Sequence, residues 1–190
     1  QAADEGEFQL VAARFGVAHP PGYPLYTLLG GLFVRLPLGD GPAWRLNLFS
    51  ALTAAVTVLL VSRIARQMTG RTTAGLSASL ILAGATTFWA TATRASIRPG
   101  VAFFTALMLY ALSATCFEWH VGRFTCRLSR PTLFAIALGL GVSHHPSLIF
   151  VGTVCAIYLV LVDPGLLRRP RRWWRPALAL LLTQSIWLYL

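Results

Sequence analysis

The chain has 190 residues, of which 56% are hydrophobic and only 12% are charged, and its mean hydropathy is +0.64. Soluble domains carry about 25% charged residues, so this composition excludes an ordinary soluble domain and indicates a membrane protein. The net charge of +10 comes from arginines in loops between apolar runs, which is typical of cytoplasmic membrane loops and argues against nucleic-acid binding.

The first 43 residues are expected to form a water-exposed loop with two short helices. Apolar residues from Phe8 to Phe15 have the spacing of one helix face. The segment 19–24 holds three prolines and a glycine and cannot be helical. A second apolar helix starts at Pro24 and, at about 12 residues, is too short to cross a bilayer, so it should lie in the interface plane.

Six later segments are apolar enough to be membrane helices. The run from Pro131 to Val162 is too long for one span, and Pro146 disfavours helix at His145, so a tight turn is expected there. The result is an all-α, polytopic bundle in a single membrane domain. The ends of the sequence lead us to expect a piece of a longer protein. The predicted membrane helices are 44–64, 73–92, 99–119, 131–143, 147–162 and 176–190.

The arginines are unevenly divided between the two ends of these helices. Alternate loops hold three, three and five of them, and the positive-inside rule places those loops in the cytoplasm. The N-terminal loop, the link with Arg94 and Arg98, and the turn at His144 and His145 then share the outer face. The cytoplasmic set is Arg63, Arg66, Arg71, Arg123, Arg127, Arg130, Arg168, Arg169, Arg171, Arg172 and Arg175.

The acidic residues near the N-terminus are candidate general bases. Asp4, Glu5 and Glu7 could accept a proton, although acidic residues also favour the first turn of a helix with no catalytic role. If the first helix extends back to Asp4, then Asp4 and Glu7 share its membrane-facing side. Glu5 then points about 100° away, towards water. Asp4 is therefore the predicted base, with Glu7 in reserve.

The histidines and outer arginines are candidate phosphate ligands. His19 could bind phosphate or orient a base, or be an ordinary turn residue. His144 and His145 could face a cavity, as ionisable groups within apolar runs usually do, or lie in a turn at the lipid headgroups. Arg94 could hold a phosphate or anchor a helix end. No metal site is predicted, because no spacing of possible ligands fits one.

Several blocks of the chain resemble one family. They are Asp-x-Gly-Glu-Phe at 4–8, Gly-Val-x-His-Pro-Pro-Gly-Tyr-Pro-Leu at 16–25, and Trp-Arg-Leu-Asn-Leu at 44–48. They resemble bacterial multi-spanning membrane proteins long catalogued as a domain of unknown function. The eukaryotic relative of that family is a protein O-mannosyltransferase acting on plexin-type receptor domains. The looser blocks Phe88-Trp89, Ala92–Ala95 and Ser143–His145 also fit.

The resemblance implies a C-type glycosyltransferase (GT-C) fold and a polyprenyl-phosphate sugar as donor. Asp4 matches the acidic catalytic residue of the first outer loop. His19, Tyr23, Arg94, His144 and His145 are the expected substrate or phosphate ligands. One position departs from the family pattern, because Ser96 stands where a Glu is expected after Thr-Arg-Ala.

The predicted function is transfer of a sugar, expected to be mannose, to a protein or lipid hydroxyl at the outer face of the bacterial inner membrane. The expected partners are membrane lipid, the lipid-linked donor and the acceptor, without nucleic acid. No cofactor is implied, and a need for a divalent cation stays open. The alternatives are a transporter or flippase of lipid-linked sugars, and a catalytically inactive member that binds a partner. The predicted spans carry no Asp or Glu at their centres, which counts against ion-coupled transport.

Overall fold

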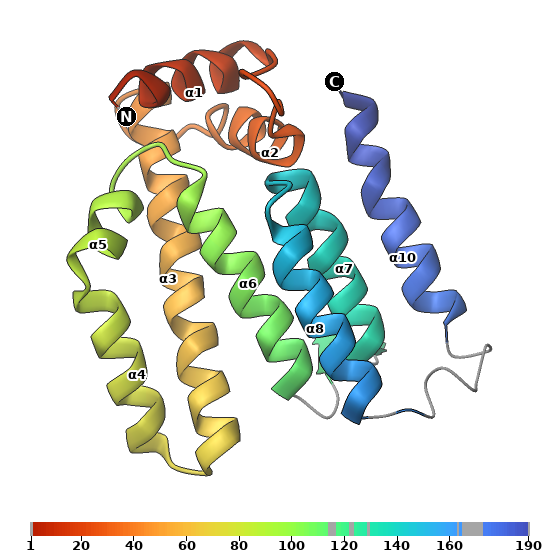
Figure 1. The fold of residues 1–190 in the computed structure, drawn as a ribbon. Helices are drawn as coiled ribbons and strands as arrows, with labels where there is room; N and C mark the ends of the chain where they lie inside the picture. Colours follow the sequence, from red (N-terminus) through yellow and green to blue (C-terminus); the bar gives the residue numbers. More distant parts are fainter. Residues whose placement is uncertain are drawn as a thin grey trace.

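The structure is a computed structural model that describes residues 2–113, 117–121, 124–128, 130–162, 164 and 173–189. Most helices stand side by side, and two short helices, α1 and α2, lie across one end of them (Figure 1). The helices are α1 Ala2–Arg14, α2 Pro24–Phe33, α3 Pro42–Thr69, α4 Thr72–Gly84, α5 Thr86–Ala92, α6 Arg98–Ser113, α7 Arg130–His144, α8 Leu148–Val162, α10 Trp174–Gln184 and the 3-10 helix η2 Ser185–Tyr189. The described residues also include an antiparallel hairpin of β1 Phe117–Val121 and β2 Phe124–Leu128.

The longest helix, α3, has clear start and stop signals in the sequence. Pro42 lies in its first turn, where the missing N–H costs nothing. Gly70 ends it in the left-handed conformation with φ 68°, and the Gly70 N–H donates to the Arg66 carbonyl at 2.8 Å. Within the part of the chain that the structure describes, α3 is long and apolar enough to cross a membrane, and the bent pair α4–α5 passes the same test if counted as one span.

Two predicted helices have different boundaries in the structure. The segment 73–92 is two helices bent by 69° at Ala85, which has extended backbone angles. Gly84 and the β-branched Thr86 and Thr87 lower helix propensity at that point. The predicted helix 99–119 ends at Ser113, and 117–121 pairs as a strand instead. Aromatic and β-branched residues dominate that hairpin and favour strand over helix.

The break predicted at His144-His145-Pro146 is confirmed. Helix α7 ends at His144 and α8 begins at Leu148, whose N–H donates to the His145 carbonyl at 3.1 Å. The turn lies at the same end of the bundle as α1, α2 and the α5–α6 link, and the α3–α4 turn lies at the opposite end (Figure 1). The three segments predicted to share a face therefore do lie together, while the side of a membrane that they face stays a prediction.

Two buried clusters form the core of the molecule. One joins α1, α2 and the start of α3, with Phe8, Tyr26 and Leu46 almost fully buried. The other joins α6, α7 and α8. A close contact between α6 and α7 links the clusters, because His144 Nε2 donates to the Ile97 carbonyl at 2.8 Å and its ring lies against Gly100.

Gly100→Ala should destabilise the protein, because a Cβ at Gly100 would lie 2.2 Å from His144 Nε2. Overpacking of this kind costs about 1–3 kcal/mol. Gly84→Ala is the matched control, since nothing lies within 4 Å of its Cβ, and it should leave stability unchanged or raise it by up to about 1 kcal/mol. Thermal unfolding of the purified variants measures both. Equal melting temperatures would contradict the contact.

Candidate functional site

One cavity at the α1–α2 end of the bundle is lined by several charged and polar side chains. Its volume is about 380 Å³, and it lies between α1, the loop before α2, and residues 87–98. Its lining residues come from three segments far apart in the sequence, so no single short motif contains all of them. Among its lining residues are Asp4, Glu5, His19, Tyr23, Arg94, Ser96 and Arg98.

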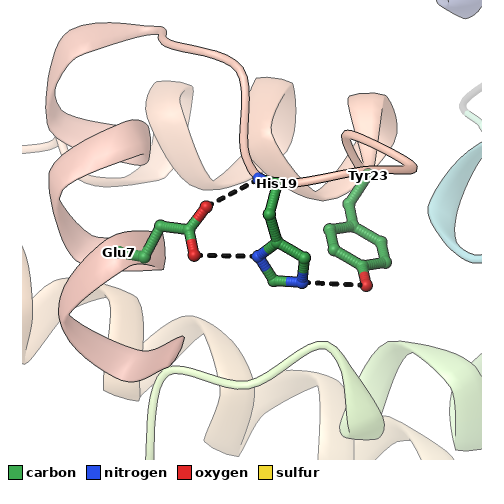
Figure 2. A network of polar contacts seen from close by, with 3 residues as sticks. All are labelled: Glu7, His19 and Tyr23. Atoms are coloured by element: carbon green, nitrogen blue, oxygen red, sulfur yellow. Dashed lines mark hydrogen bonds and ion pairs between the residues drawn. The ribbon is translucent and has the colours of Figure 1, made fainter. Parts of the chain in front are cut away.

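Glu7 binds His19 at two atoms at once (Figure 2). Glu7 Oε1 accepts the His19 backbone N–H at 2.6 Å, and Glu7 Oε2 lies 2.8 Å from His19 Nδ1. The backbone hydrogen bond and then the side-chain hydrogen bond hold the pKa of Glu7 below its usual value. Glu7 is not among the residues that line the cavity. Its geometry makes it a partner of His19 rather than a free base.

The contact with Glu7 determines which nitrogen of His19 faces the cavity as an acceptor. A carboxylate only accepts, so Nδ1 carries a proton, and in the neutral ring Nε2 is then unprotonated. Nε2 lies 3.3 Å from the Tyr23 hydroxyl, which donates to it (Figure 2). Glu7, His19 and Tyr23 thus form a chain of polar contacts ending at the cavity wall.

Tyr23 is held in a conformation that is unusual for a bulky residue. Its φ of 46° and ψ of 55° are left-handed, a strain of order 1–3 kcal/mol that packing must offset. Its ring meets Phe8 edge-on at 5.7 Å and stacks on His145 at 5.5 Å. Burial, followed by the charges of Asp4 and Glu7, raises the pKa of Tyr23, so the hydroxyl stays protonated as a hydrogen-bond donor.

The two acids in the first turn of α1 both line the cavity. Asp4 is exposed, and Glu5 forms an ion pair with Arg94 at 3.6 Å. The expectation that Glu5 points away to water is therefore wrong. Helix periodicity could not have shown that Arg94 and His19, from other segments, attract Glu5 and Glu7 in different directions.

The two histidines of the α7–α8 turn do not line this cavity. His144 is buried, donates to the Ile97 carbonyl, and belongs to the packing between α6 and α7. His145 supports Tyr23 by stacking, and its Nδ1 accepts the Ser147 backbone N–H at 3.1 Å. Of the two, His144 lines the second cavity, described next.

A second cavity of about 340 Å³ adjoins the first, and its lining is almost entirely apolar. It lies between α2, α3 and α6, and its walls include Phe33, Val56 and Phe103. Ser96 lines both cavities. The apolar stripe of α2 was visible in the sequence, but its pairing with α3 and α6 depends on tertiary contacts.

No group of three or more His, Cys, Asp or Glu residues is placed to hold a metal ion within the described ranges.

Comparison with known proteins identifies the family. Residues 4–164 match the family model described as "Protein O-mannosyl-transferase TMEM260 N-terminal domain". The chain belongs to this family. It is 28% identical over 167 residues to Protein O-mannosyl-transferase TMEM260 of Mus musculus, covering 87% of this chain and 22% of the mouse protein. It is 38% identical over 60 residues to Protein O-mannosyl-transferase tmem260 of Dictyostelium discoideum, covering 30% of this chain and 7% of that protein.

The TMEM260 relationship supports glycosyl transfer at the level of the family, and it confirms the relationship to O-mannosyltransferases inferred from the sequence blocks. The chain spans about a fifth of the length of the mouse relative. No solved structure matches the chain.

Glu7→Gln should lower stability at neutral pH, and the difference from the wild type should shrink in acid. The folded-state pKa of Glu7 is below its ordinary value of 4.5. Its stabilising contribution is therefore present above that value and lost as the pH falls through the folded pKa. Melting temperatures from pH 7 down to about pH 3 would measure this.

A double-mutant cycle with His19→Gln provides the control for Glu7→Gln. Because the two side chains contact each other, their combined cost should be less than the sum of the single costs. Additive costs at pH 7 would contradict a side-chain interaction between Glu7 and His19.

Proposed function

We propose that this chain contains the catalytic loop of a membrane glycosyltransferase that moves mannose from a polyprenyl-phosphate donor to a protein or lipid hydroxyl. The observation that carries the proposal is that Ser96 lines both a polar cavity and an apolar one. A lipid-linked sugar has the same division, with a charged phosphate between a polar sugar and a hydrocarbon chain. The family relationship supports the sugar-transfer part of the proposal.

The polar cavity offers groups for both ends of the reaction. The exposed carboxylate of Asp4 would take the proton of the acceptor hydroxyl while the hydroxyl oxygen attacks the anomeric carbon of the sugar. The bond from that carbon to the phosphate oxygen breaks, and negative charge builds on the departing phosphate. Arg94 and Arg98 line the same cavity and would stabilise that charge. Attack opposite the departing phosphate inverts the anomeric carbon.

The apolar cavity would hold the first part of the donor's hydrocarbon chain. Its walls on α2, α3 and α6 are apolar. Covering them with the hydrocarbon chain would stabilise donor binding by about 25 cal/mol for each Å² of apolar surface removed from water. Burial of this kind favours a long-chain donor over a short one.

The proposed setting is a membrane crossed several times, with the α1–α2 end on the outer face. Helix α3 is long enough to span, and large apolar side chains such as Leu59, Ile81 and Phe150 are more than half exposed, as lipid-facing residues would be. The arginine asymmetry supports the orientation with the catalytic loop in the periplasm of a bacterial inner membrane.

Asp4→Asn should reduce mannosyl transfer by about 10²-fold or more, because it keeps the shape of the side chain and removes the proton acceptor. Transfer from polyprenyl-phosphate mannose to an acceptor, with the full-length protein in membranes, is the measurement. Asp40→Asn is the matched control, since Asp40 is exposed in the loop before α3, outside the cavity. Near-normal turnover in Asp4→Asn would remove Asp4 as the base. A wild-type protein that binds the donor without transferring sugar would instead support the alternative of a catalytically inactive member of the family.

Val56→Trp should reduce transfer from long-chain donors by about tenfold or more, while a donor with only two isoprene units is affected much less. Val56 lines the apolar cavity, so the larger side chain competes with the hydrocarbon chain. Leu59→Trp is the matched control, because Leu59 lies one turn further along α3, is 64% exposed and does not line the cavity. Equal losses with both donors would show that the donor chain binds elsewhere.

A further inference from the structure

The chain of contacts from Glu7 through His19 to Tyr23, called here the relay, has a use beyond holding the loop. We propose that it is a proton-coupled phosphate ligand: His19 takes up a proton when the donor's phosphate binds, and the Tyr23 hydroxyl then turns from His19 to the phosphate. This inference rests on the proposed function, and it makes Glu7 a positioning residue for His19 rather than a reserve base.

The first step is the fixed orientation of the imidazole. Glu7 holds the His19 backbone N–H at 2.6 Å and Nδ1 at 2.8 Å, so the ring cannot turn without breaking a charge-assisted contact. The His19 side chain is 42% exposed on a cavity wall, with Nε2 directed at Tyr23. A proton arriving at this ring can therefore bind only at Nε2.

The second step is the change in hydrogen-bond direction that this proton causes. With neutral His19, the Tyr23 hydroxyl donates its single proton to Nε2 across 3.3 Å. With protonated His19, Nε2–H becomes a donor, and the Tyr23 oxygen can only accept from it. The Tyr23 O–H is then free to donate into the cavity. One proton on His19 thus supplies the cavity with positive charge and a newly available donor, both suited to an anionic oxygen.

Charged groups from several elements surround the His19 ring. Glu7 touches it, and the carboxylates of Asp4 and Glu5 line the same cavity. Arg94 in the α5–α6 link and Arg98 at the start of α6 line it as well, and Arg94 is paired with Glu5. From the α7–α8 turn, His145 stacks on Tyr23. A phosphate bound beside the two arginines offsets their charge, so phosphate binding and protonation of His19 favour each other.

Asp4 and the relay have separate roles in this proposal. Asp4 would accept the proton of the acceptor hydroxyl, and the relay would serve the departing phosphate. The relay neither forms nor breaks a covalent bond, since its proton comes from solvent on binding and returns when the phosphate leaves.

Isothermal titration calorimetry of the full-length protein can count the proton directly. The probe is a short-chain prenyl-phosphate mannose without acceptor, because its phosphodiester ionises well below neutral pH and adds no titration of its own. Binding heats at pH 7.5 in buffers of different ionisation enthalpy give the number of protons taken up. The wild type should take up a substantial fraction of one proton, and its affinity should fall with rising pH, by up to about tenfold for each unit.

Four variants distinguish a role in proton uptake from a purely structural role of these contacts. His19→Gln should abolish the proton uptake, and Glu7→Gln should reduce it. Tyr23→Phe keeps the ring packing and should keep the uptake, but affinity should fall by about tenfold because the released donor is missing. Asp40→Asn is the matched control: it removes a carboxylate that is exposed in the loop before α3, outside the cavity, so the uptake should persist.

Binding without proton uptake in the wild type, or uptake unchanged in His19→Gln, would overturn the relay while leaving the proposed function intact. Tyr23→Phe with unchanged affinity would overturn the part assigned to Tyr23. Failure of the wild type to bind the mannosyl phosphodiester at all would refute the proposed function, and the relay with it.

Discussion

The site depends on one pair of hydrogen bonds, those that Glu7 makes with the backbone and ring of His19. They join α1 to a Pro-rich loop that has few backbone donors and cannot be stabilised as helix or strand. Because this loop leads directly into Tyr23 and α2, the same contact positions the cavity wall and the N-terminal end of α2. Strain at Tyr23 persists because the packing around that contact offsets it.

The α5–α6 link matters to the site as much as the Pro-rich loop does. It supplies Arg94 to the polar cavity and Ser96 to the lining of both cavities, and it leads directly to Arg98 at the start of α6. Its position is fixed from two sides, by the His144 hydrogen bond to the Ile97 carbonyl and by the contact of the Ser96 N–H with Ser50 Oγ at 3.4 Å. The bend between α4 and α5 lies just before this link and changes the direction of the chain on its way to the site.

Local patterns were enough to predict the helical class, the two short helices, the turn at His145 and the grouping of three segments at one end of the bundle. The low helix propensity near Gly84 and the strand preference around Trp119 were also visible in the sequence. The apolar character of both segments nevertheless favoured a continuous membrane helix in each. The pairing of Glu5 with Arg94 and of Glu7 with His19 could not be predicted, because residues 89 and 12 positions apart meet only through tertiary packing. Periodicity gives the face of a helix, whereas the partner on that face depends on the rest of the fold.

The position of Ser96 in the lining of both cavities suggests a physical consequence of having Ser where the family pattern has Glu. The polar cavity is lined by two carboxylates, Asp4 and Glu5, and two guanidinium groups, Arg94 and Arg98, so their formal charges balance. A Glu at position 96 would add a negative charge where the two cavities join. Ser96 is neutral there, and its hydroxyl accepts the Arg98 backbone N–H at 3.2 Å. Since a negative charge there would repel the phosphate of the proposed donor, Ser96 leaves the cavity better suited to an anion.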